Sequence, residues 1–92
     1  MKVLWTPEAL QDRLIIWEYI SSENPQAAIK IDVLFSQAAK TLEKHPMLGQ
    51  RGKVSGTRDF IVHKNYRLVY QLKEDTIWLL ALVHTARQWP AP

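Results

Sequence analysis

The sequence predicts an α+β domain with an N-terminal strand and an antiparallel helical hairpin packed on one face of a small, mostly antiparallel sheet. Two segments with helical apolar spacing, followed by three strand-like runs in the C-terminal half, lead to this class. The order strand, helix, helix and several strands is typical of α+β proteins. With 92 residues and no internal repeat or linker, the chain is expected to form one domain over residues 1–92.

The N-terminal run leads directly into the first predicted helix. Residues 1–5 are short and largely apolar, which suits a strand at or near the sheet edge. Thr6 can cap a helix, Pro7 suits its first position because proline has no N–H, and Glu8 complements the helix dipole. We expect this helix to run to about Ser21. Its buried stripe is expected to contain Leu10, Leu14, Trp17 and Ile20, with Asp12, Arg13 and Glu18 nearer to solvent.

A second helix is predicted after a short break. Asn24 suits the cap and Pro25 the first helical position, and so short a break favours an antiparallel hairpin. His45-Pro46 ends the helix because a proline moves the preceding residue out of the α region. In the connection at 47–56, Val54 is the candidate for a short strand. The apolar stripe of the second helix is expected to contain Ala27, Ile31, Leu34, Ala38 and Leu42.

Three strands are predicted in the C-terminal half. Residues 58–63 are rich in β-branched and aromatic side chains, and Lys64-Asn65 offers a tight turn into a second strand. In that second strand Arg67 is expected to face away from the more apolar side, because strand side chains alternate. The third run, 77–83, has no polar side chain and is placed in the middle of the sheet. The sheet face opposite the helices is expected to remain uncovered.

Positive charge is concentrated in the sheet half of the chain. Residues 1–46 contain five Lys or Arg against six Asp or Glu, and residues 47–92 contain seven against three. A positive field on one side of a small protein favours a polyanion or an acidic partner segment. The alternative is ordinary surface charge that maintains solubility.

Several functional classes lack support in the sequence. There is no cysteine, and the three histidines lie on separate predicted elements, so neither a metal site nor a cofactor is expected. Phosphate-binding loops, dinucleotide-binding turns, nucleophile elbows and HExxH motifs are absent. The longest apolar run is too short to span a bilayer, so we expect a soluble, cytoplasmic protein without membrane contact.

A cationic set remains as the candidate functional site. Guanidinium groups can hold a phosphate and stabilise the charge of a pentacoordinate transition state, and a histidine can exchange the proton. For most residues of this set the alternative to a functional role is that of an ordinary solvated charge in a turn, in a loop or at a sheet edge. For His84 the alternative is a hydrogen-bonding cap at the end of the buried strand. Arg67 is harder to explain in this way because it must cross a sheet face. The set comprises Arg51, Lys53, Arg58, Lys64, Arg67, His84 and Arg87.

Five segments are spread over almost the whole sequence: TPEAL, YISSENPQAA, LEKHPMLGQRGKVSGTRDF, YRLVYQL and LVHTARQWP. In these segments the sequence resembles toxins of the RelE/ParE superfamily from bacterial type II toxin–antitoxin modules. None of the matching segments is a catalytic signature alone, but their order and spacing are specific. The resemblance implies a RelE/ParE-like fold and a growth-arresting toxin neutralised by a cognate antitoxin. The antitoxin is expected to supply an acidic or amphipathic segment near Arg58, Arg67 or Arg87.

The superfamily contains two mechanisms, and the resemblance leaves both open. RelE-like members are ribosome-dependent endonucleases that cleave mRNA through the ribose 2′-hydroxyl. Arg67 within YRLVY falls on a catalytic arginine of that class, and Arg87 lies near a second, with His84 as a further catalytic candidate. However, no Tyr follows His84, and the closing aromatic residue is Trp89.

ParE-like members instead inhibit DNA gyrase and need no nuclease site. The NPQAA hairpin and the LVHTAR ending resemble that branch, which is the one we favour. A third alternative is a member that binds its antitoxin without arresting growth. The candidates for target or nucleic-acid contact are Arg51, Lys53, Arg58, Lys64 and Trp89.

Overall fold

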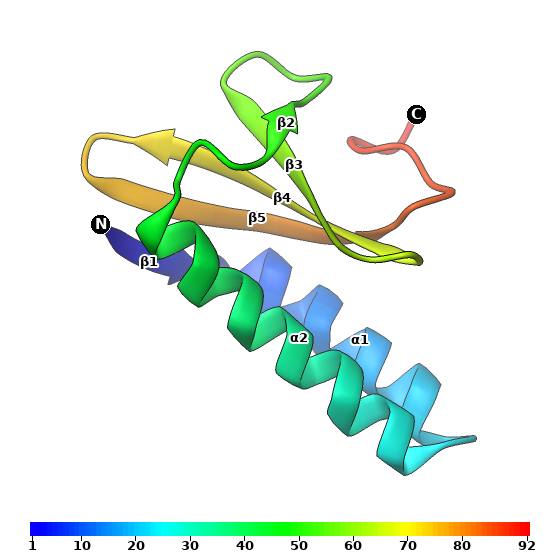
Figure 1. Ribbon diagram of the computed structural model, residues 1–92. Helices are drawn as coiled ribbons and strands as arrows, with labels where there is room; N and C mark the ends of the chain where they lie inside the picture. The colour runs from blue at the N-terminus through cyan, green and yellow to red at the C-terminus, as the bar shows by residue number, and fades with distance from the viewer.

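The computed structural model describes residues 1–92 and places two helices side by side on one face of a sheet (Figure 1). This arrangement and the element order agree with the sequence prediction. Neither helix combines the length and apolar character that crossing a membrane requires. The elements are β1 (Lys2–Trp5), α1 (Pro7–Ser21), α2 (Pro25–Lys44), β2 (Gln50–Arg51), β3 (Thr57–His63), β4 (Tyr66–Lys73) and β5 (Thr76–His84).

The sheet has five strands in the order β1-β5-β4-β3-β2. β1 runs parallel to β5, and the other three pairings are antiparallel, so the sheet is mostly antiparallel as predicted. β1 forms one edge, which also agrees with the prediction. β5 has a neighbour on both sides, but the central strand is β4 rather than β5. The prediction that the 77–83 run occupies the middle of the sheet is therefore wrong by one strand.

The predicted helix caps and the Lys64-Asn65 turn are confirmed. The Thr6 hydroxyl accepts a hydrogen bond from the Ala9 N–H at 3.2 Å and donates one to the Leu79 carbonyl at 2.7 Å. This second bond attaches the start of α1 to β5. The Asn24 side chain likewise accepts a bond from the backbone of α2. Each cap satisfies a donor that the helix itself leaves without a partner.

Val54 does not form a strand. The short strand β2 lies earlier, at Gln50–Arg51, where it pairs with β3. The carbonyl of Val54 instead accepts hydrogen bonds from the N–H and the hydroxyl of Thr57. The Gly52 N–H also donates to the Thr57 carbonyl, which closes a loop in front of β3. The β-branched side chain of Val54 favoured a strand, but the prediction is wrong because local turn hydrogen bonds determine the backbone conformation here.

A bulge interrupts the pairing of β4 with β5. Val69 is opposite Ala81, whereas the next residue, Tyr70, is opposite Leu79, so Leu80 is an extra residue in β5. An extra residue shifts the alternation of side chains by one position. After the bulge, Leu82 joins Leu79 in the core beneath the helices, and Ala81 and Val83 join Val69 on the other face.

The core lies between the helices and one face of the sheet. The β4 prediction is confirmed here, because Tyr66, Leu68 and Tyr70 share the helix-facing core. The Tyr70 hydroxyl donates to the Pro46 carbonyl and accepts from the Gly49 N–H, both at 2.8 Å. These bonds hold the connection after α2 against the sheet. The fully buried side chains of the core include Phe35, Leu42, Leu68, Tyr70, Ile77 and Leu79.

The predicted buried stripe of α1 is confirmed at Ile20, which packs against the core, but is wrong at Leu10 and Leu14. Leu10 and Leu14 are each 49% exposed, and Ala9 is the residue of α1 that is fully buried. Two polar side chains turn the helix away from the predicted orientation. The Asp12 carboxylate accepts a hydrogen bond at 3.1 Å from the Leu82 N–H, which lies close to the β5 bulge. Arg13, also expected near solvent, turns toward α2 instead.

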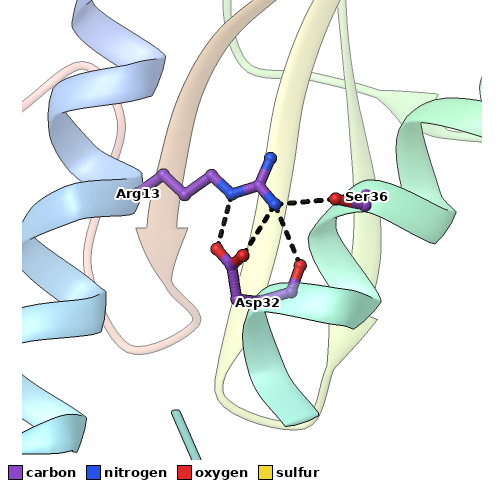
Figure 2. A network of polar contacts seen from close by, with 3 residues as sticks. All are labelled: Arg13, Asp32 and Ser36. Atoms are coloured by element: carbon purple, nitrogen blue, oxygen red, sulfur yellow. Dashed lines mark hydrogen bonds and ion pairs between the residues drawn. The ribbon is translucent and has the colours of Figure 1, made fainter. Parts of the chain in front are cut away.

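Arg13 forms the polar connection between the two helices (Figure 2). Its Nε lies 2.6 Å from one Asp32 carboxylate oxygen, and its Nη2 lies 3.0 Å from the other. Nη2 also donates to the Asp32 carbonyl and to the Ser36 hydroxyl. A bidentate arginine–carboxylate pair fixes both distance and direction. The network therefore sets the relative height of α1 and α2.

We predict that Asp12 gives the stability of the fold a pH dependence that Asp12→Asn removes. Burial raises the pKa of the Asp12 carboxyl above its ordinary 3.8, although the Leu82 hydrogen bond opposes this. The folded chain therefore keeps the Asp12 proton to a higher pH than the unfolded chain does. The stabilisation that protonated Asp12 gives at low pH is lost as the pH rises from the pKa of Asp12 in the unfolded chain through its pKa in the folded chain. Urea unfolding of both proteins across acidic and neutral pH measures the difference.

The control variant is Asp12→Ala, which leaves the Leu82 N–H without its acceptor. We expect Asp12→Ala to lower the free energy of unfolding by about 1–3 kcal/mol at every pH. A difference between wild type and Asp12→Asn that stays constant with pH would contradict the prediction.

Candidate functional site

Arg67 lies on the sheet face opposite the helices, as the alternation of β4 predicted. Its neighbours on β4, Tyr66 and Leu68, point into the helix-facing core. Arg67 is opposite Ile61 on β3 and opposite Val83 on β5. Its side chain is only 17% exposed. A charged side chain buried to this extent needs a partner or a ligand.

Asp59 on β3 is the partner of Arg67, and the sequence analysis did not single it out. The Arg67 Nε lies 3.6 Å from an Asp59 carboxylate oxygen, which makes an ion pair but is too long for a hydrogen bond. That buried Nε has no hydrogen-bond partner. The pairing follows from the strand register, because Asp59 is opposite Val69, two residues along from Arg67. Alternation within 57–63 was the signal that places Asp59 on this face.

The C-terminal segment partly covers this face, contrary to the prediction that it remains open. The Thr85 hydroxyl donates to the Lys64 carbonyl, and the Thr85 N–H donates to the Asn65 carbonyl. These bonds attach the segment to the β3–β4 turn. Trp89 then packs on the apolar cluster of Val69, Ala81 and Val83. Figure 1 shows the C-terminus on the side of the sheet away from both helices.

A hollow of about 400 Å³ lies between this segment and the sheet, and we call it the far-face hollow. Three cationic side chains surround one carboxylate there, so the hollow carries an excess of positive charge that favours an anion. Arg67 and Asp59 form its inner part, and Lys53 and Arg87 are exposed at its border. Its lining comprises Lys53, Asp59, Arg67, Thr85, Ala86, Arg87, Gln88 and Trp89.

His84 does not line the far-face hollow. It is opposite Tyr66, and the two rings meet edge to face with centroids 5.7 Å apart. Tyr66 in turn contacts Phe35 of α2, at 5.8 Å between centroids. The His84 Nδ1 accepts a hydrogen bond from the Ala86 N–H. The bulge at Leu80 explains this position, because uninterrupted alternation from Leu79 would put His84 on the same face as Arg67.

The remaining cationic candidates lie apart from the far-face hollow. Arg58 donates to the carbonyls of Gly49, at 2.6 Å, and Met47, at 3.3 Å. Arg51 is opposite Arg58 in the β2–β3 pairing, and both line a second hollow of about 500 Å³ beside the loop before β3. Lys64 is exposed in the β3–β4 turn. No cluster of three or more His, Cys, Asp or Glu side chains is placed to hold a metal ion.

Comparison with known proteins identifies the family. Residues 3–89 match the family described as ParE toxin of type II toxin-antitoxin system, parDE. The chain belongs to this family. It is the toxin component of a type II toxin–antitoxin system, and this membership implies a cognate antitoxin as its partner.

Individual relatives agree with this membership. The chain is 28% identical over 90 residues to "Putative toxin Y4kP" of Sinorhizobium fredii, covering 97% of this chain and 93% of that one. It is 28% identical over 88 residues to toxin RelE2 of Caulobacter vibrioides, covering 94% and 97%. A structure of the chromosomal ParDE system from P. aeruginosa superposes with a TM-score of 0.82 at 20% identity, covering 91% and 95%. The fold of this toxin is thus the RelE/ParE fold expected from its sequence.

We predict that the Asp59–Arg67 pair stabilises the toxin. Removing Asp59 with Asp59→Ala leaves the mostly buried Arg67 charge without its carboxylate. We expect the free energy of unfolding to fall by about 1 kcal/mol at low ionic strength. Chemical denaturation measures the loss, with Asp75→Ala, at an exposed turn residue, as the matched control.

A double-mutant cycle separates the pair from other effects of Asp59. In an Arg67→Gln background the Asp59→Ala change is expected to lower stability much less. Equal losses in the two backgrounds would show that Arg67 is not the group Asp59 stabilises.

Proposed function

We propose that this toxin arrests growth by ParE-like inhibition of DNA gyrase through protein contact. The observation that carries the proposal is the separation of His84 from Arg67 onto opposite faces of the sheet. Cleavage through a 2′-hydroxyl needs a group that accepts a proton, a group that donates one and a stabiliser of the phosphate charge, all around one atom. Arg67 and Arg87 suit the last role, but the histidine is absent from their hollow.

The state of Arg67 supports the same conclusion. Its guanidinium is mostly buried and already faces the Asp59 carboxylate, so part of its charge is compensated within the protein. A phosphate group approaching Arg67 would also approach Asp59, which repels it. The match to the ParE family over residues 3–89 is a further, independent support.

We assign the contact with gyrase to the exposed border of the far-face hollow. Arg87 and Lys53 are exposed there, and Trp89 supplies a partly buried aromatic surface beside them. Arginine and tryptophan are the residue types that most often dominate protein–protein binding energy. An acidic segment of the target, or of the antitoxin in competition with it, complements this border.

The first experiment measures supercoiling by purified gyrase. We expect the wild-type toxin to inhibit the reaction, and Arg87→Ala to need a concentration at least about fivefold higher, as the loss of one interfacial arginine predicts. Lys73→Ala, at an exposed lysine at the other end of β4, serves as the control and is expected to act like the wild type. Normal supercoiling at a large excess of wild-type toxin would refute the proposal.

A ribosome-dependent mRNA endonuclease is the second candidate, and one observation favours it. Three cationic side chains surround the far-face hollow, and the buried Arg67 Nε there has no hydrogen-bond partner. In that case Lys53 or Asp59, rather than His84, would have to exchange the proton. RNA binding would also weaken with salt, with a logarithmic slope of roughly −0.7 per phosphate contacted.

The two candidates differ in their response to Arg67→Gln. We predict that a reporter transcript in a translating extract stays intact with the wild-type toxin, and that Arg67→Gln still arrests growth when expressed. Cleaved transcript with the wild type, lost with Arg67→Gln, would replace gyrase inhibition by the endonuclease. Normal growth on induction of folded wild-type toxin would instead indicate a protein that binds its antitoxin without toxicity.

A further inference from the structure

The outer surface of the two-helix layer exposes an apolar strip. Leu10 and Leu14 of α1 are each 49% exposed, and Ile29 and Val33 of α2 are 53% and 46% exposed. Exposed large apolar residues grouped on one surface indicate an interaction site. We call these four residues the seam strip, because they border the line along which α1 and α2 meet.

The Arg13–Asp32 pair locates the seam strip. Leu10 and Leu14 lie three residues before and one after Arg13, and Ile29 and Val33 have the same spacing around Asp32. With 3.6 residues per turn, this spacing places each pair on one side of its polar residue. Because the core-facing side chains of each helix lie on the opposite side, the strip faces outward, away from the sheet.

Charges of opposite sign lie on the two helices beside the strip. On the same side as the strip, α1 carries Glu18 and α2 carries Lys30 and Lys40. These three side chains are exposed and form no ion pair within the chain. A surface with an acidic group on one helix and basic groups on the other is complementary to a second copy of itself.

The heights of Glu18 and Lys30 along the helices also match. Arg13 contacts Asp32 and Ser36, so it is level with the middle of that turn of α2. At 1.5 Å per residue, Glu18 lies about 7.5 Å from this level and Lys30 about 6 Å in the same direction, since the helices are antiparallel.

We propose that the seam strip binds a second copy of this chain across a two-fold axis parallel to the helices. Such an axis puts α1 of one copy over α2 of the other and keeps every height unchanged. Leu14 then meets Val33 of the second copy, and Glu18 meets Lys30. Symmetry forms each of these contacts twice.

The size of the surface fits this occupant. The helical layer is roughly 30 Å long along α2 and roughly 20 Å wide, which approaches the area of about 800 Å² per partner that stable complexes bury. A uniformly acidic partner would bring like charge against Glu18, and a uniformly basic one against the two lysines. The far-face hollow lies on the other side of the sheet and stays accessible in this dimer.

Sedimentation of the full chain over a concentration series tests the dimer. We expect the wild type to be dimeric and Leu14→Glu to be monomeric. Glu18→Lys and Lys30→Glu are each expected to raise the dimer dissociation constant about tenfold, because each replaces two attractive pairs by two repulsive ones. The double variant Glu18→Lys/Lys30→Glu restores opposite charges and is expected to return the constant to near the wild-type value.

The matched control is Ile61→Glu, which places a charge on an apolar side chain of β3 that is 60% exposed. It is expected to leave the dimer intact. If Leu14→Glu fails to fold by circular dichroism, the charge variants carry the test, since their side chains are exposed. A wild type that stays monomeric, or a double variant as weak as the single ones, overturns the proposal. A monomer whose antitoxin binding is lost in Leu14→Glu assigns the strip to the antitoxin instead.

Discussion

The bulge at Leu80 determines which side chains meet on each face of this sheet. In the segment of β5 before it, Ile77 and Leu79 point toward the helices, and the extra residue allows Leu82 to do the same. The N–H of Leu82 donates to Asp12, so the first helix is attached to the sheet close to this irregularity. One extra residue therefore orients α1, completes the core and selects the face on which β5 ends.

The same irregularity divides the cationic residues into separate groups. Arg67 and Arg87 meet in the far-face hollow, whereas His84 contacts Tyr66 at the edge of the core. The side chains around a polar group on a sheet are those that share its face, and a single inserted residue changes which side chains these are. A toxin with this fold but with the bulge at another position would place other side chains around the arginine equivalent to Arg67. A shared architecture can support more than one target in this way.

The sequence was most informative where periodicity is strong and local. The alternation of β4 correctly separated Arg67 from Tyr66, Leu68 and Tyr70, and capping chemistry located both helices. The orientation of α1 was missed because it depends on two polar contacts, of Asp12 with β5 and of Arg13 with α2, that join residues far apart in the chain. Apolar spacing could not find them, since α1 carries large apolar residues on nearly every side.

The site was only partly accessible to sequence reasoning for the same reason. Residue type identified the arginines and Trp89 as candidates. Asp59 joins the candidate site through strand register, and the contact of Trp89 with Val69 and Val83 depends on the return of the C-terminal segment. Family membership supplied the biological role that no local motif contains.

The position of Trp89 has a practical consequence for handling the protein. Because the last residues lie beside the far-face hollow, a purification tag or fluorescent fusion at that end would occupy the space that the proposed contact with gyrase requires. Lost potency of such a fusion would report steric obstruction and not the activity of the toxin. Labels are better attached ahead of β1, at the sheet edge farthest from β2.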